Sequence, residues 1–367
     1  MTNSLFSPIT FGNLEIRNRI GVSPMCQYSS VDGFASDWHV VHLGSRAIGG
    51  AGLVMMEATA VTPEGRITPA CNGIWDNAHV EPLKRVTEFI RAHGAVAAIQ
   101  IAHAGRKAST AVPWLGRSTL TEKEGGWKPV APSAIPFKAD DEAPHEMTLD
   151  DIRRTQDAFV AAAHRSAAAG FQIVELHGAH GYLMHEFLSP LSNKREDEYG
   201  GSEENRFRFM LETAKRVRDE IPKDVVVGAR LSCIDWAEGG LGIEDSVRLS
   251  AALKKLGVAF IDCSSGALVA NAQMTVKPGY QVPFAKEIRA KAEIPTCAVG
   301  LITEPRHAND IVSSGAADMV FLARAFLRDP YWPVNAAIEL GAAPSVPNQY
   351  LRGYEPAALG GEKRKAS

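Results

Sequence analysis

The sequence has few cysteines, and none of them are spaced as metal ligands usually are. Its 367 residues contain five, at positions 26, 71, 233, 263 and 297, and no two stand in a CxxC pair. An odd, dispersed set argues against a disulfide framework, a zinc site and an iron–sulfur cluster, and it favours a reducing cytoplasm.

Long apolar runs and an excess of one charge are also missing. No stretch approaches the length of a membrane span, and residues 1–20 lack the basic and apolar segments of a secretory signal. The formal net charge is only −3, without a basic amphipathic stretch. We therefore expect a cytoplasmic protein that acts on small molecules and binds neither nucleic acid nor a membrane.

What the sequence does contain is a regular alternation of apolar and amphipathic segments. Eight runs are continuously apolar, which is typical of buried parallel strands: residues 19–25, 52–61, 95–105, 171–181, 225–233, 260–266, 294–301 and 318–326. Helix-like segments lie between them. In the clearest one, Thr148 is suited to cap the first turn and Gly170 to end the helix. Other helices are expected to begin near Trp38, His79, Glu203, Ile243, Val282, Glu304 and Pro330.

Eight successive strand-then-helix units predict an α/β protein with a closed (β/α)8 TIM barrel, because a doubly wound open sheet usually has fewer units. Residues 5–20 have the pattern of a small hairpin that could plug the N-terminal mouth of the barrel. A long irregular loop from Arg106 to His145 follows the third strand, on the side where such loops usually serve an active site. We expect one domain over residues 1–355 and a disordered tail over residues 356–367.

Chemistry in such barrels lies at the C-terminal ends of the strands. The polar or reactive residues at or near those ends are Cys26, Tyr28, Gln100, His103, His177, His180, Tyr182 and Arg230. Several have a purely structural alternative: Gln100 could satisfy a stray backbone group, and the cysteines at 233, 263 and 297 are expected to be buried fillers. Arg230 is harder to dismiss, because an arginine at the end of an apolar strand needs an anion or another acceptor.

The two histidines at the end of the fourth strand raise the question of a metal. His177 and His180 leave the strand together, but a metal needs further ligands, and Glu57 and Glu175 lie inside strands rather than at the rim. A pair of donors for a substrate oxygen, with Tyr182 beside them as proton donor, is the stronger interpretation. No metal site is therefore expected.

The last two strands end in a way that is typical of phosphate binding. The runs VGL and ARAF, which include Gly300 and Arg324, match the phosphate-binding corner of barrel enzymes. Together with Gln100 and Arg230 they indicate a pocket for a flat, phosphorylated cofactor. No GxGxxG turn of a dinucleotide-binding domain is present.

Six longer sequence motifs occur in order along most of the chain. They are SPMCQY, EATAV, QIAHAGRKA, ELHGAHGYLMHEFLSPLSNKREDEYGGSEENRFRF, DCSSGAL and FLARAFLRDP. Together, from about Leu5 to Tyr354, they resemble the Old Yellow Enzyme flavoproteins, and in particular the bacterial branch with a cysteine near the flavin. The resemblance implies an FMN-dependent, NADPH-using ene reductase that reduces activated C=C bonds of α,β-unsaturated carbonyl compounds.

The same resemblance implies roles for individual residues. The flavin would be contacted by Ser23, Pro24, Met25, Cys26, Ala58, Gln100 and Arg230, and its phosphate by Gly300, Ala323 and Arg324. His177 and His180 would bind the carbonyl oxygen of the enone, and Tyr182 would protonate its α-carbon after hydride reaches the β-carbon. Tyr28 would contact the same substrate. Arg352 would reach the active site of a neighbouring subunit, which predicts a homodimer or homotetramer.

The chain differs from other members of the resembling family at three positions, and three other functions are alternatives to ene reduction. The classical yeast-like branch has Thr in place of Cys26 and Asn in place of His180, and relatives often have Gly in place of Ala323. Larger relatives carry an additional iron–sulfur and nucleotide domain after the barrel. We expect this chain to be too short for such a domain. A metal-dependent lyase would need a carboxylate to complete its site. A passive flavin carrier would not need His177, His180 and Tyr182 together.

Overall fold

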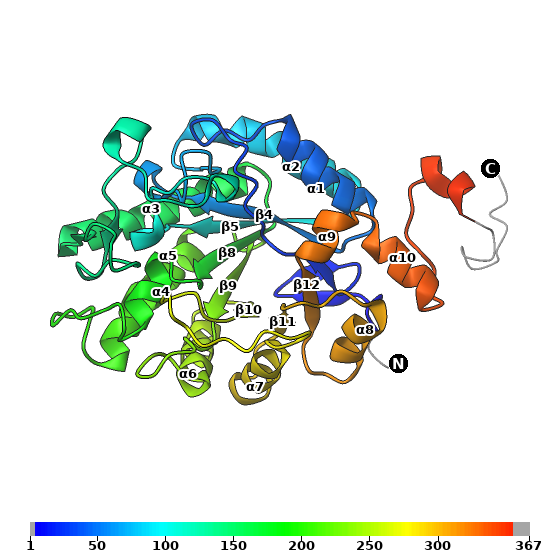
Figure 1. The fold of residues 1–367 in the computed structure, drawn as a ribbon. Coiled ribbons are helices and arrows are strands. Elements are labelled where there is room, and N and C mark those ends of the chain that lie inside the picture. The colour runs from blue at the N-terminus through cyan, green and yellow to red at the C-terminus, as the bar shows by residue number, and fades with distance from the viewer. Residues whose placement is uncertain (1–3, 355–367) are drawn as a thin grey trace.

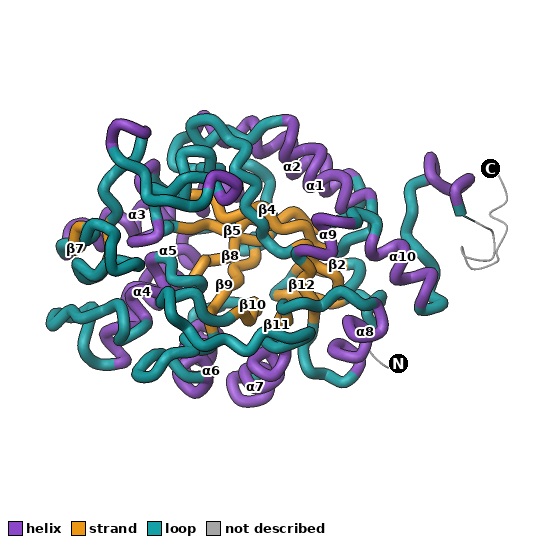
Figure 2. The backbone as a smooth tube through the Cα atoms, viewed as in Figure 1, coloured by secondary structure: helices purple, strands orange, loops and turns teal. Residues whose placement is uncertain are grey.

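The eight apolar runs form the eight strands of a parallel barrel. In this computed structural model, which describes residues 4–354, they are β3 (Ile20–Val22), β4 (Leu53–Ala60), β5 (Val96–Ala102), β8 (Ile173–Gly178), β9 (Val226–Ser232), β10 (Phe260–Ser264), β11 (Thr296–Ala298) and β12 (Met319–Leu322). The barrel closes in the order β10-β11-β12-β3-β4-β5-β8-β9. Helices surround this central ring of strands (Figure 1; Figure 2). The predicted (β/α)8 barrel is confirmed.

Ten helices follow or flank the strands in the described part of the chain. They are α1 (Asp37–Ile48), α2 (Val80–Ala92), α3 (Leu149–Ala168), α4 (Leu183–Leu188), α5 (Glu203–Glu220), α6 (Ile243–Lys255), α7 (Val282–Ala292), α8 (Pro305–Ser313), α9 (Arg324–Arg328) and α10 (Trp332–Glu339). Every predicted start lies within about two residues of an observed one. The short helices α4 and α9 were not predicted, because a helix of one turn or so is too short to show a 3.6-residue period.

Helix α3 shows why the capping prediction was reliable. The side chain of Thr148 accepts a hydrogen bond from the backbone N–H of Asp151, whose carboxylate in turn accepts from the Thr148 backbone N–H at 2.8 Å. At the other end Gly170 has a φ of +86°, a left-handed conformation that ends the helix at little steric cost.

The N-terminal half of the barrel interior is apolar and is closed by the hairpin formed by β1 (Ile9–Phe11) and β2 (Leu14–Ile16). Phe11 and Ile16 belong to one buried cluster with inward-facing residues from the starts of the barrel strands, such as Leu53. Phe11 stacks on Phe260 with 4.7 Å between the ring centroids. The predicted plug is therefore confirmed. Gly228 makes room for this layer, since a Cβ atom there would lie 2.2 Å from the Phe260 ring.

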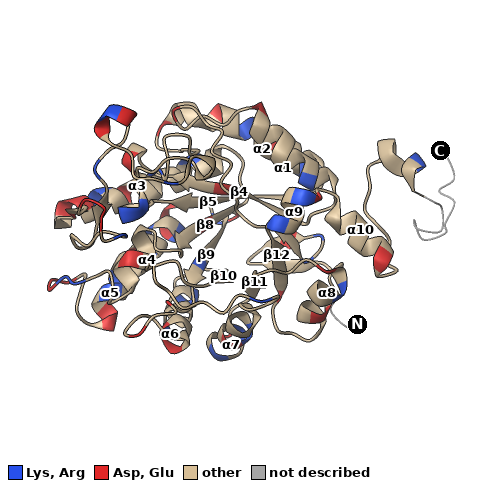
Figure 3. Ribbon diagram, viewed as in Figure 1, with Lys and Arg blue, Asp and Glu red and all other residues tan. Residues whose placement is uncertain are grey.

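The C-terminal side of the barrel carries the long loop (residues 106–145). It contains the 3-10 helices η3 (Gly105–Lys107), η4 (Pro113–Leu115) and η5 (Glu122–Glu124), and the pair β6 (Val130–Ala131) with β7 (His145–Glu146). Charged residues of both signs are spread over the outer helices and this loop (Figure 3). Of the helices between residues 4 and 354, none has the length and apolar character needed to cross a membrane.

Beyond α10 the chain leads to η6 (Asn348–Gly353), which stands apart from the barrel (Figure 1). Arg352 lies on η6 and is exposed. The tail predicted over residues 356–367 lies outside the described residues.

Candidate active site

The two histidines and the tyrosine that follow β8 come together, as the sequence predicts. The His177 and His180 rings are 5.2 Å apart at 90°, and those of His177 and Tyr182 are 5.0 Å apart at 76°. His180 has a φ of +61°, and its backbone N–H donates to Ser232 Oγ at 2.9 Å, which holds this unusual conformation. Its Nε2 lies 2.6 Å from Ser264 Oγ. Neighbouring strands therefore fix the orientation of this ring.

The protonation states of this trio suit hydrogen-bond donation to an oxygen. Burial, and then the positive charge of Arg230, lower the pKa of both His177 and His180 well below the ordinary value, so both imidazoles are neutral and carry one N–H each. Burial raises the pKa of Tyr182, so its phenol keeps its proton. His177 Nδ1 is buried and has no hydrogen-bond partner within residues 4–354. A ligand oxygen would satisfy such a group.

A polar layer lies inside the barrel just below these residues. Gln100 Nε2 donates to Glu175 Oε1 at 2.8 Å, and Arg230 Nε lies 3.1 Å from Asp262 Oδ2 at an angle that is poor for a hydrogen bond. Arg230 also donates from Nη1 to Ser23 Oγ at 3.4 Å. The anion that Arg230 required is therefore the carboxylate of Asp262, and its hydrogen-bond acceptor is Ser23. The other explanation for Gln100, a stray backbone group, is wrong, because its amide donates to the Glu175 side chain.

The two carboxylates of this layer share one guanidinium. Burial, and then Asp262, raise the pKa of Glu175 to about 8, against which Arg230 acts only in part. Burial likewise raises the pKa of Asp262 to about 6. Both side chains are fully buried. At neutral pH the layer therefore retains a proton on Glu175, which limits its net negative charge.

The segment after β3 is held from β4 and α1. Glu57 Oε2 accepts from the backbone N–H of Gln27 at 2.7 Å, and its Oε1 lies 3.1 Å from His39 Nε2. This fixes the loop that carries Cys26 and Tyr28. Cys26 is half-buried, and burial followed by the charge of Glu57 raises the pKa of its thiol, so it is not a thiolate.

A cavity of about 380 Å³ is lined by His180 and Arg230 together with Gly300, Ala323 and Arg324. These residues come from four different strand ends, as expected of a barrel site. The cavity therefore brings together predicted cofactor residues that lie far apart in the sequence.

One wall of this cavity requires glycine. Gly300 has a φ of +129°, and a Cβ atom there would lie 3.0 Å from the Tyr280 ring and 3.1 Å from Gln281 Nε2. Gln281 in turn donates to the Val299 carbonyl at 2.9 Å. A cavity lined by the guanidinium groups of Arg230 and Arg324, with a backbone wall open to close approach, fits a flat cofactor with a phosphate tail.

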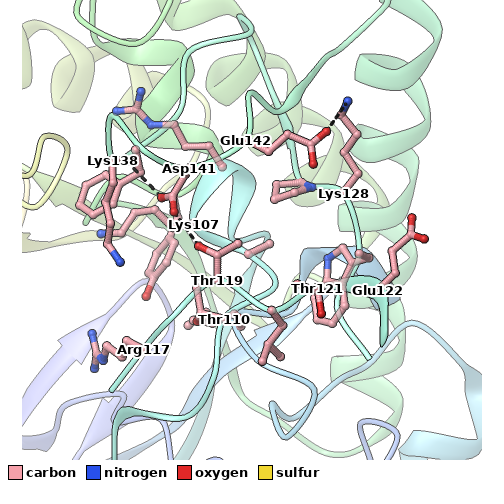
Figure 4. A pocket seen from close by; sticks show the side chains of 18 of the residues that line it. Lys107, Thr110, Arg117, Thr119, Thr121, Glu122, Lys128, Lys138, Asp141 and Glu142 are labelled. Carbon is pink, nitrogen blue, oxygen red and sulfur yellow. Dashed lines mark hydrogen bonds and ion pairs between the residues drawn. The ribbon is translucent and has the colours of Figure 1, made fainter. Parts of the chain in front are cut away.

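A second and larger cavity, of about 720 Å³, lies under the long loop and reaches Tyr182 (Figure 4). Lys107 stands between this cavity and the trio. Its Nζ donates to the His180 carbonyl at 2.8 Å and to the Ala267 carbonyl at 2.9 Å, and lies 5.3 Å from the centroid of the Tyr182 ring. Burial lowers the pKa of Lys107 to about 8. The trio thus borders one cavity through His180 and the other through Tyr182.

Other predicted residues lie in their expected places. Ser23, Pro24 and Met25 follow β3, and Ala58 lies on β4 with Tyr182 at a small adjoining gap. Cys233, Cys263 and Cys297 are fully buried in the cores, which agrees with their prediction as fillers. Arg352 is not brought to the site of its own chain.

Several residues of the site were not identified from the sequence. Asp262 and Ser264 lie within DCSSGAL and Lys107 within QIAHAGRKA, but their contacts at the site are seen only in the structure. For Asp262 a signal was present, since a carboxylate at an inward position of an apolar strand needs a partner just as Arg230 does. Within the described residues, no three His, Cys, Asp or Glu side chains converge as a metal site would require.

The chain is similar over most of its length to known proteins. A family model described as "NADH:flavin oxidoreductase / NADH oxidase family" matches residues 4–342. An NADPH dehydrogenase of Geobacillus sp. (strain WCH70) is 48% identical over 356 residues, which are 96% of this chain and 99% of that relative. Among solved structures, the Old Yellow Enzyme homologue from Zymomonas mobilis has a TM-score of 0.75 and 27% identity, covering 97% of this chain and 98% of its own.

A larger enzyme is also similar in structure. The complex of 2-naphthoyl-CoA reductase with 2-naphthoyl-CoA gives a TM-score of 0.82 and 28% identity, and it covers 93% of this chain. This chain spans 53% of that protein, about half of its length.

Proposed function

The chain belongs to the NADH:flavin oxidoreductase / NADH oxidase family, and on that premise we propose that it is an ene reductase of the Old Yellow Enzyme type. It is an FMN-dependent oxidoreductase with NADPH as reductant. We propose further that its oxidising substrates are α,β-unsaturated carbonyl compounds. The observation that carries it is the trio His177, His180 and Tyr182, which borders both cavities.

FMN, when bound, supplies the transfer of hydride from NADPH to an alkene carbon. The residues that would hold it are those of the smaller cavity and the polar layer. Arg230 and Gln100 would face the ring system, and Gly300, Ala323 and Arg324 would hold the phosphate. Cys26 and the neighbouring residues after β3 would lie against the ring.

His177 and His180 would bind the carbonyl oxygen of the substrate. Negative charge grows on that oxygen as hydride adds to the β-carbon, so a donor that is already oriented stabilises the transition state more than the ground state. Because both imidazoles are neutral, each has one N–H to offer without the desolvation of a buried cation. For His180 this requires Ser264 Oγ to donate to Nε2, so that the proton of the ring is on Nδ1. The contact from His180 to Ser264 fixes the ring before the substrate arrives.

Tyr182 would deliver the proton to the α-carbon. A general acid must keep its proton until the carbon becomes basic, and burial of Tyr182 ensures this by raising its pKa. Tyr28, whose pKa burial also raises, would contact the same substrate.

The proposal is tested by the two half-reactions. Purified protein should be yellow with an FMN spectrum; without oxygen, NADPH should bleach it and cyclohexenone should restore the colour. A flavin that NADPH bleaches but that no activated alkene reoxidises would contradict ene reduction and leave a NADPH-dependent flavin oxidoreductase with another acceptor.

A further inference from the structure

The larger cavity has more room than a small enone needs. Its volume is about 720 Å³, nearly all of its walls come from the long loop, and Tyr182 lies at its inner end. Within the proposed reaction, the largest ligand that must reach this point is the nicotinamide dinucleotide, which bears several phosphate charges. A cavity that binds such a ligand should have cationic side chains on its walls.

The cavity is lined by more cations than anions, although the whole chain has a net charge of −3. The cations are Arg106, Lys107, Arg117, Lys123, Lys128 and Lys138, and the anions are Glu122, Asp141 and Glu142. In Figure 4, Arg117, Lys107 and Lys138 lie on one side, whereas Lys128, Glu122 and Glu142 lie on the other. The cavity thus has a cationic side.

Some charged side chains on these walls already have partners. Lys128 Nζ lies 3.1 Å from Glu142 Oε1, which neutralises that pair. Asp141, on the cationic side, accepts from Thr119 Oγ1 at 2.7 Å and from the backbone N–H of Lys138 at 3.3 Å. Neither Arg117 nor the Lys138 ammonium forms an ion pair with any residue between 4 and 354. Two cations of this side are therefore available to a ligand.

Arg117 is also close enough to act on the catalytic groups. Its charge opposes the rise in the pKa of Tyr28 and Tyr182 that burial causes, and it adds to the lowering of the pKa of Lys107. Its backbone has a φ of +54°, a conformation that a residue with a Cβ atom rarely adopts. Such conformations persist where the surroundings impose them and are frequent at ligand sites.

We propose that Arg117 and Lys138 bind phosphate groups of NADPH, so that the long loop forms the dinucleotide subsite of this enzyme. The inference rests on the proposed function, because it assumes that the nicotinamide end reaches the trio. A guanidinium suits a phosphate because its N–H groups match two phosphate oxygens, and a lysine adds a point charge. A carboxylate on the alkene substrate has similar chemistry, and the experiment separates the two sources.

The test compares Arg117→Ala, Lys138→Ala and the double variant with Lys128→Ala, which removes a cation of the same cavity that Glu142 already neutralises. Anaerobic stopped-flow measurement of flavin bleaching gives the Kd and limiting rate for NADPH and for NADH. Reoxidation is followed with cyclohexenone and with a matched pair of enones, one bearing a terminal carboxylate and the other its methyl ester. Flavin absorbance per mole of protein reports folding.

In the double variant the Kd for NADPH should rise roughly tenfold, since hydrogen bonds between charged groups are among the stronger ones but these cations are partly exposed. The Kd for NADPH should change far more than the limiting rate or the rate of reoxidation by cyclohexenone. The Kd for NADH should rise less, because NADH lacks one phosphate. The dependence of the NADPH Kd on salt should become shallower. Arg117→Lys should restore part of the affinity, and Lys128→Ala should resemble wild type.

An unchanged Kd for NADPH in the double variant would overturn the proposal. So would a selective loss of the carboxylate-bearing enone, which would make the substrate the source of the anion. An equal loss in Lys128→Ala would also overturn it, because a general effect of cavity charge would then explain the result. If neither nucleotide bleaches the wild-type flavin, the proposed function itself is wrong.

Discussion

Gln100 Nε2 donates a 2.8 Å hydrogen bond to Glu175 Oε1, from paired inward positions on β5 and β8. The pair belongs to a buried layer in which Glu175 and Asp262 share the single guanidinium of Arg230. Two buried carboxylates beside one cation cannot both ionise without a large desolvation cost. The same layer orients the amide of Gln100, which is predicted to bind the flavin, and keeps a proton on Glu175.

Replacing Glu175 by Gln should flatten the pH dependence of stability. The pKa of this carboxyl is about 8 in the folded chain against an ordinary 4.5, so the native state binds more protons than the unfolded state between these values. Its stabilising contribution is complete below about pH 4.5 and is lost as the pH rises through about 8. The wild type should lose on the order of a few kcal/mol across that window through this group, and Glu175→Gln should not.

Thermal unfolding of the FMN-loaded proteins from pH 5 to pH 8.5 measures this difference. Glu186 is a useful comparison, because burial also raises its pKa to about 8 but it bonds to the backbone N–H of Arg106, outside the polar layer. Glu186→Gln should flatten the curve in the same direction, whereas only Glu175→Gln should also alter the pH dependence of FMN affinity. Parallel pH curves for wild type and Glu175→Gln would contradict the assignment of a stored proton.

The combined substitution of His177 and His180 by Ala should leave FMN bound but abolish tight binding of phenols. A phenolate would take the place of the enone oxygen, and each hydrogen bond to a charged oxygen is worth roughly 1.5–3 kcal/mol. Losing both should weaken the Kd by about two orders of magnitude or more, as measured by titrating the charge-transfer band. Wild-type affinity in the double variant would show that these rings do not bind the oxygen.

Tyr182→Phe should separate the two half-reactions. The phenyl ring keeps the shape of the site but cannot donate a proton, so reoxidation by cyclohexenone should slow by roughly 10²–10⁴-fold. Bleaching by NADPH involves no proton from Tyr182 and should change little. Stopped-flow measurement of each half-reaction makes the comparison, and equal slowing of both would indicate a general distortion instead.

Cys26→Ala should shift the flavin reduction potential while the fold is preserved. We predict that the thiol, which keeps its proton at neutral pH, lies against the flavin, where it would tune the ring electronics. Cys297→Ala is the control, because Cys297 is equally apolar but lies in the cluster sealed by the hairpin. Spectroscopic redox titration should show a shift for Cys26→Ala only. Identical potentials in the two variants would make Cys26 a filler.

Arg352 should complete the substrate pocket of an adjacent subunit. It is exposed on η6, which stands apart from its own barrel, so within one chain it has no access to the trio. Arg352→Ala should raise the KM for enones or NADPH with little change in FMN content. Mixed oligomers of this variant with the His177/His180 double variant should recover activity, because one pocket then receives both intact halves. Sedimentation of the wild type as a monomer at assay concentration would refute this.

The sequence alone determined the barrel fold and the location of the site at the C-terminal ends of the strands. Continuous apolar runs separated by capped amphipathic segments leave a parallel closed sheet as the simplest way to bury every strand on both faces. Once the strands are parallel, their C-terminal ends share one rim, so His177, Arg230 and Gly300 must face the same region. These inferences use local periodicity and chain order, both of which are written in the sequence.

Only the tertiary structure decided which of these groups touch. The contact between Gln100 and Glu175 joins residues 75 positions apart, and that between His185 and Asp235 joins residues 50 apart. Such pairs depend on the register between neighbouring strands and on side-chain packing, where a shift of one residue reverses which face a side chain occupies. The cationic side of the larger cavity likewise depends on how the long loop folds over Tyr182. The sequence of this loop has no hydrophobic period from which its conformation could be predicted.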